Sequence, residues 1–66
     1  MKRVFKVTLH LNDMSKNDYR IATKKDDQDA REIAVQLEIK SFEHANLKFP
    51  GVEMAEVEFV SYLDAG

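Results

Sequence analysis

Residues 3–11 alternate between apolar and polar side chains with a period of two. Successive side chains of a β-strand leave opposite faces of a sheet, so this alternation predicts a half-buried strand. Its apolar face consists of Phe5, Val7, Leu9 and Leu11. Residues 18–24 alternate in the same way, with Tyr19, Ile21 and Thr23 on one face. The polar stretch from Asn12 to Asp18 predicts a loop, and the two strands are therefore expected to form a hairpin.

A helical pattern follows from about residue 26 to about residue 46, without glycine or proline. Asp26 and Asp27 are both suitable N-caps, because a carboxylate accepts hydrogen bonds from the first N–H groups of a helix. Asn46 is suited to the left-handed residue that commonly ends a helix. The apolar residues that recur at helical spacing are Ala30, Ile33, Ala34 and Leu37.

Alternation returns in residues 52–63, after the turn signal Pro50-Gly51. The order β-β-α-β predicts an α+β fold in which a three-stranded antiparallel sheet, of order 2-1-3, carries one α-helix on one face. Residues 1–66 are expected to form a single small domain. The expected core consists of Phe5, Val7, Leu9, Leu11, Tyr19, Ile21, Ile33, Leu37, Val57, Phe59 and Leu63.

The predicted helix carries more apolar surface than one sheet face needs. Ala30, Ile33, Ala34, Leu37 and Ala45 fill one arc, and a second set lies on the adjoining side, namely Val35, Ile39 and Phe42. One interpretation is that the connection after the helix folds back over the second set with Leu47, Phe49 and Val52. Another is that the second set is an exposed patch for a partner or for a second copy of the chain. A third is a scatter of exposed apolar residues.

Composition narrows the class of protein. The chain has 66 residues, of which 44% are hydrophobic and 33% charged, a globular composition. Its apolar runs are two or three residues long, against about 20 for a membrane-spanning helix, so no membrane is expected. Alternation directly after Met1-Lys2-Arg3 leaves no apolar signal segment, which favours a cytoplasmic protein with an intact start. A core of this size contributes only about 3–5 kcal/mol on its own, so a homodimer or a partner would add useful burial.

The residue types needed for catalysis do not gather in any motif. No cysteine is present, which excludes disulfides, thiolate zinc sites and cysteine nucleophiles. His10 and His44 lie on different predicted elements without metal-ligand spacing. Ser41 precedes His44 by three residues, but no third group orients the pair. No glycine-rich phosphate loop is present either. We therefore expect neither an enzyme nor a cofactor or metal.

Two functional hypotheses remain. The first is a small non-catalytic protein-binding module, a regulator or inhibitor, acting through Val35, Ile39 and Phe42. In size and style the chain is similar to short reading frames of phages and mobile elements, many of which block a host protein. The alternative is weak nucleic-acid binding by the outer sheet face. The residues for that alternative are Lys6, His10, Arg20, Lys24 and Tyr62. The net charge of −2, with Glu56 and Glu58 on that face, argues against it.

Overall fold

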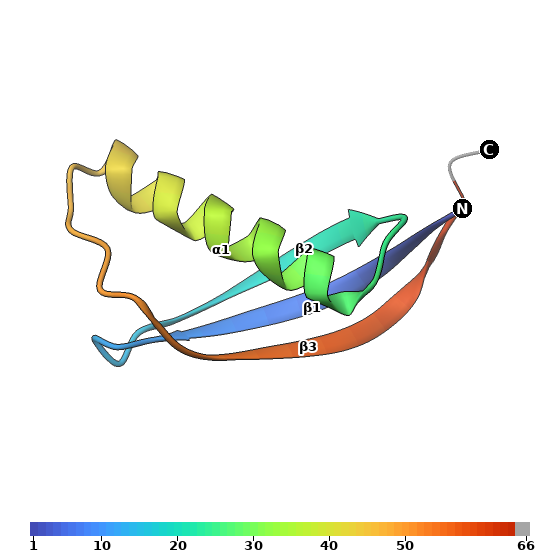
Figure 1. The fold of residues 1–66 in the computed structure, drawn as a ribbon, viewed down its shortest axis with the longest axis horizontal. Coiled ribbons are helices and arrows are strands. Elements are labelled where there is room, and N and C mark those ends of the chain that lie inside the picture. The colour runs from blue at the N-terminus through green and yellow to red at the C-terminus, as the bar shows by residue number, and fades with distance from the viewer. Residues whose placement is uncertain (65–66) are drawn as a thin grey trace.

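The computed structural model describes residues 1–64 and has the order β-β-α-β. Its elements are β1 (Lys2–Leu11), β2 (Lys16–Thr23), α1 (Asp27–His44) and β3 (Val52–Leu63). The strands form one antiparallel sheet in the order β2-β1-β3, and α1 lies along one face of it (Figure 1). The predicted α+β fold and strand order are confirmed. Among the described residues, no helix is both long and apolar enough to cross a membrane.

The hairpin between β1 and β2 is tighter than the sequence suggested, because β2 begins at Lys16. Met14 has a positive φ of 71°, and the Leu11 N–H donates to the Ser15 carbonyl at 2.9 Å. The Ser15 hydroxyl and backbone N–H both donate to Asp13 Oδ1, at 2.5 and 2.9 Å. These hydrogen bonds, the hydroxyl's above all, lower the pKa of Asp13. The loop is therefore held by its own short polar side chains.

Both ends of α1 follow the predicted capping chemistry. Asp26 is the N-cap, and its Oδ1 accepts from the Asp29 N–H at 3.1 Å. At the other end Asn46 has a φ of 58° and donates its N–H to the Glu43 carbonyl at 3.0 Å. The next N–H, of Leu47, donates to the Phe42 carbonyl at 2.9 Å, which completes a Schellman motif.

The face that α1 turns to the sheet differs from the predicted one. Ala30 and Ala34 are buried, as expected, with the apolar row of β1 and with Ile21. The prediction that Ile33 and Leu37 lie in the core is wrong, since they are 37% and 43% exposed. Small alanines at the centre allow a close approach to the sheet, and the buried arc runs from them toward Glu38 and Phe42.

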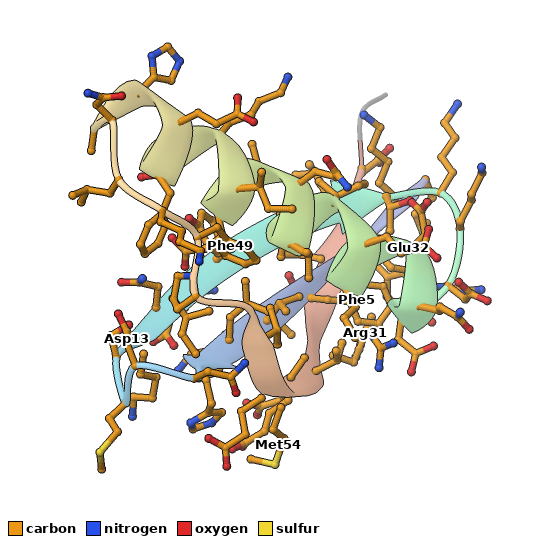
Figure 2. The ribbon with its side chains drawn as sticks, turned by 60° about the vertical axis from the view of Figure 1, so that its left-hand side comes forward. Phe5, Asp13, Arg31, Glu32, Phe49 and Met54 are labelled. Carbon is orange, nitrogen blue, oxygen red and sulfur yellow. The ribbon has the colours of Figure 1, made fainter. Side chains whose placement is uncertain are left out.

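The connection after α1 folds back over the sheet, as one of the interpretations proposed. Phe49 packs edge-to-face on Phe42, with ring centroids 5.5 Å apart, and both are packed against the core together with Val35 and Val52. Figure 2 shows Phe49 on the side of the sheet that carries α1. Leu47 takes no part in this cover and is exposed.

Two register shifts between β1 and β3 change the faces of β3. Phe59 pairs with Phe5, but Ser61 pairs with Val4, so Val60 is an extra residue in a β-bulge. Residues that pair in an antiparallel sheet share a face. Tyr62, paired with Arg3, therefore lies on the α1 side, and Leu63, paired with Lys2, on the outer side. The predictions of Tyr62 on the outer face and of Leu63 in the core are both wrong for this reason.

Candidate functional site

Over residues 1–64, the free edge of β3 combines unpaired backbone groups with exposed apolar side chains. β3 pairs only with β1, and over residues 1–64 no strand pairs with its other edge. A free edge presents a row of backbone N–H and C=O groups that another strand can pair with, and proteins commonly protect such edges with lysine or proline. β3 contains neither. Five large apolar side chains of β3 are exposed by 40–62%, namely Met54, Phe59, Val60, Tyr62 and Leu63.

A groove runs between this edge and the N-terminal half of α1, and we call it the β3 groove. One part of it has a volume of about 360 Å³ and is lined by Arg3, Phe5, Asp26, Asp27, Val57, Phe59 and Tyr62. The adjoining part, of about 390 Å³, is lined by Asp27, Gln28, Arg31, Ala55 and Val57. The two parts share Asp27 and Val57 and are therefore continuous. Their common floor is the α1-facing side of β3.

Aromatic rings form the floor at one end of the β3 groove. Phe59 packs edge-to-face on buried Phe5, with ring centroids 5.8 Å apart, and on Tyr62 at 5.1 Å. Phe59 nevertheless keeps 47% of its surface exposed, because α1 covers the sheet only in part. A ring held in one orientation by two others is a rigid apolar contact surface.

The outer face of β3 is acidic. Glu56 and Glu58 lie there, opposite Thr8 and Lys6 of β1. His10 Nε2 donates to Glu56 Oε1 at 2.8 Å. Lys6 makes its ion pair with Asp18 of β2 at 3.8 Å and not with Glu58. Within the described part of the chain the Glu58 carboxylate makes no hydrogen bond or ion pair, and β3 itself contains no lysine or arginine.

The residues of the sheet-face hypothesis are only partly brought together. Lys6, His10 and Arg20 share the outer face, where they line or adjoin a polar hollow. Lys24 lies in a bend beyond the end of β2, and Tyr62 lies on the opposite face. Figure 2 shows Met54, the neighbour of His10, pointing away from α1 on the outer side. The basic and aromatic groups therefore do not form one platform.

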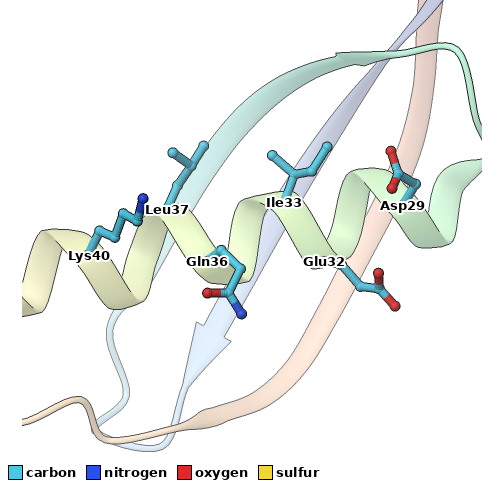
Figure 3. A pocket seen from close by; sticks show the side chains of 6 residues that line it. All are labelled: Asp29, Glu32, Ile33, Gln36, Leu37 and Lys40. Atoms are coloured by element: carbon cyan, nitrogen blue, oxygen red, sulfur yellow. The ribbon is translucent and has the colours of Figure 1, made fainter.

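The three α1 residues predicted to bind a partner, namely Val35, Ile39 and Phe42, are half-buried. Val35 and Phe42 pack against the core, and Ile39 lies beside them on α1. The exposed apolar side chains of α1 are instead Ile33 and Leu37, which project in the same direction (Figure 3). A shallow hollow around them is lined by six side chains of α1 alone, and Asp29, Glu32 and Lys40 supply its charges.

One buried polar cluster was not recognised from the sequence. Glu38 of α1 is 2% exposed, and its carboxylate accepts hydrogen bonds from Asn17 Nδ2 at 2.8 Å and from the Tyr19 hydroxyl at 3.2 Å. Burial, and then the nearby Glu38 carboxylate, raise the pKa of Tyr19. Because both donors come from β2, the cluster joins α1 to the sheet. Its oxygens are satisfied inside the protein, so it is a structural contact.

No metal-binding arrangement occurs in residues 1–64, in the sense of three or more histidine or acidic side chains gathered together. His44 is exposed at the end of α1, whereas the hydrogen-bonded pair His10 and Glu56 lies on the sheet. The β3 groove therefore offers backbone pairing, aromatic contact and carboxylates as its binding chemistry. No protein-family model, no curated protein and no solved structure matches this chain.

Proposed function

We propose that the protein is a small non-catalytic protein-binding module that takes up an extended segment of another protein as a fourth strand on β3. The observation that carries the proposal is the free edge of β3 with its exposed apolar side chains. Strand addition obtains affinity from main-chain hydrogen bonds and specificity from the side chains on either face. The backbone groups and the side chains that this mode of binding requires all lie along the free edge of β3.

The β3 groove supports this mode of binding over a flat contact. Every second side chain of an added strand would point toward α1 and enter the groove over Val57 and Phe59. The side chains between them would lie beside Glu56 and Glu58 on the outer face. A segment held in this way is withdrawn from its other contacts, which is how a small regulator or inhibitor acts.

Nucleic-acid binding by the outer face is the weaker proposal. Lys6 is paired with Asp18, and His10 is hydrogen-bonded to Glu56, so two of its basic groups already have acidic partners. Glu58 adds a further negative charge where a phosphate backbone would lie. Within residues 1–64 that face carries no phenylalanine, tyrosine or tryptophan for stacking, because Tyr62 lies on the α1 side.

A selection of random extended peptides on the immobilised protein tests the proposal. We expect wild type to enrich strand-forming sequences, and Phe59→Lys to lose them because a charge then lies on the groove floor. Ile33→Lys makes a comparable change at the exposed surface of α1 and should retain the enrichment. Circular dichroism must show that both variants are folded.

Two outcomes would contradict the proposal. One is that wild type enriches no sequence above an uncoated surface. The other is that Phe59→Lys and a second groove variant, Tyr62→Lys, keep the wild-type enrichment while Ile33→Lys loses it, which would assign binding to the helix.

A further inference from the structure

The charges around the β3 groove specify what kind of segment fits it, an inference that rests on the proposed function. We infer that the bound segment alternates basic and apolar residues. Its basic side chains lie beside Glu56 and Glu58, and its apolar side chains lie opposite Ala55, Val57 and Phe59. The pattern covers five consecutive residues and reads apolar-basic-apolar-basic-apolar.

The outer face of β3 selects for the basic positions. Glu56 and Glu58 are two residues apart, so both carboxylates point to the same side of the sheet and would flank alternate residues of an added strand. Both are exposed, and Glu58 makes no ion pair within residues 1–64. The β1 residue that pairs with Glu58 is Lys6, and the Lys6 ammonium forms its ion pair with Asp18 instead. A cation supplied from the free edge would complete the charge pairing of this face.

The α1 side of the groove selects for the apolar positions. Its floor is formed by Ala55, Val57 and Phe59, which all face α1. The charged groups along its wall are of both signs, namely Asp26, Asp27, Arg3 and Arg31. Because these charges balance, the wall favours neither an acidic nor a basic residue. The apolar floor therefore favours apolar side chains of the bound segment.

A second copy of the chain fits this pattern poorly. Pairing of β3 with the β3 of another copy, centred on Val57, would place Glu56 beside Glu58 of the other copy, and like charges directly opposite are destabilising. The outer row of β2 contains Lys16 and Arg20, but Asp18 lies between them. Neither of the two edge strands, β2 and β3, therefore supplies two successive basic side chains on the outer face, whereas a foreign segment can supply them.

Synthetic peptides test the pattern directly. The probe is an acetylated and amidated Thr-Val-Lys-Val-Lys-Val-Thr peptide, and the two comparison peptides carry threonine or glutamate in place of both lysines. Binding is measured by isothermal titration calorimetry at low ionic strength, and amide hydrogen exchange locates the bound peptide. We expect the lysine peptide to bind about tenfold more tightly than the threonine peptide, from two cross-strand charge pairs, and the glutamate peptide to bind most weakly. The preference should weaken as salt is added.

Charge reversal on the protein provides the matched experiment. The double variant Glu56→Lys with Glu58→Lys should invert the order, so that the glutamate peptide binds best. Glu32→Lys makes the same kind of change on the exposed side of α1 and should leave the order as in wild type. The amides of β3 should be the ones that exchange more slowly when peptide is bound.

The outcomes separate this inference from the proposed function. Equal binding of the lysine and threonine peptides, with protection of β3, would overturn the charge pattern and leave strand addition standing. Absence of any binding, with unchanged exchange of β3, would overturn both. A wild-type mass of twice 7.6 kDa that returns to 7.6 kDa in Phe59→Lys would show that a second copy occupies the edge, and would overturn the foreign segment.

Discussion

At the residue scale, Glu38 decides how α1 sits on the sheet. A carboxylate that leaves water is destabilising unless hydrogen bonds replace its hydration, and here Asn17 and Tyr19 supply them. Ala30 and Ala34 lie on the same arc of α1 and are also buried. The orientation that places these small residues over β1 therefore also buries Glu38. Ile33 and Leu37 are left outside as the consequence.

Tyr19 gives this cluster a measurable pH dependence. Its folded-state pKa is raised above the ordinary value of 10.0, so the folded protein keeps the phenolic proton at a pH where the unfolded chain releases it. The associated stability is complete below about pH 10 and is lost as the pH rises through the folded pKa. In urea unfolding, wild type should lose stability across this range more steeply than Tyr19→Phe, which has no phenol to titrate.

The same variant reports the hydrogen bond at neutral pH. Tyr19→Phe should lower the free energy of unfolding by about 1 kcal/mol, because Glu38 then loses one of its two donors. Equal stability of the two proteins at neutral pH, or parallel loss of stability above about pH 10, would contradict the role assigned to this hydroxyl.

At the element scale, the start of β3 is fixed by a contact with the hairpin loop. Gly51 has a φ of 93°, and its carbonyl accepts from the Asn12 N–H at 3.0 Å. The Asn12 side chain also donates to the Pro50 carbonyl at 3.1 Å. These bonds, with the extra residue at Glu53, set the register in which Val52 faces the core and Met54 faces outward. The faces of β3 that line the groove and carry the glutamates follow from that register.

Gly51→Ala tests this control of β3. A Cβ at this position would lie 2.9 Å from Asn12 Nδ2, and the backbone is in the left-handed region that disfavours alanine. We expect the free energy of unfolding to fall by about 1–3 kcal/mol, measured by chemical denaturation. Lys48→Ala, at an exposed position of the same connection, is the control and should change stability by less than about 0.5 kcal/mol. A Gly51→Ala protein as stable as the control would show that the contact does not hold β3.

At the scale of the whole molecule, three strands and one helix leave the sheet incomplete. α1 packs on all three strands, but β3 is long, five of its large apolar side chains are exposed, and its outer edge is unpaired over residues 1–64. A fourth strand would cover these groups and add burial to a domain whose own core supplies only about 3–5 kcal/mol. Binding and stability are therefore expected to rise together.

Thermal unfolding tests this coupling. At a free concentration about 100 times its dissociation constant, the lysine peptide should raise the free energy of unfolding by about 2.7 kcal/mol. For a domain of this size, the midpoint of unfolding should rise by roughly 10–20 °C in circular dichroism. The glutamate peptide at the same concentration is the control. Equal shifts with both peptides, or none with either, would contradict the coupling.

Local patterns in the sequence were enough to predict the elements and their order. Period-two alternation identified all three strands, and short-range chemistry narrowed the start of α1 to Asp26 or Asp27 and placed Asn46 beyond its end. The free edge of β3 also follows from the predicted order 2-1-3, and the lack of lysine in residues 52–63 was a visible signal of a pairing edge. These features depend on residues close together in the chain, where steric and hydrogen-bonding preferences act directly.

Which sides of α1 and β3 are buried depended instead on contacts between elements. The helix has two apolar flanks, and the sequence does not show which one is buried. Asn17 and Tyr19 of β2 bind Glu38, and Phe49 of the connection packs on Phe42. These contacts with other parts of the chain determine the buried side. In β3 a single bulged residue, Val60, exchanged the faces of Tyr62 and Leu63 without changing the alternation that predicts a strand. The physical reason is the same in both cases: a periodic pattern defines the faces of an element, whereas contacts between elements determine which face is buried.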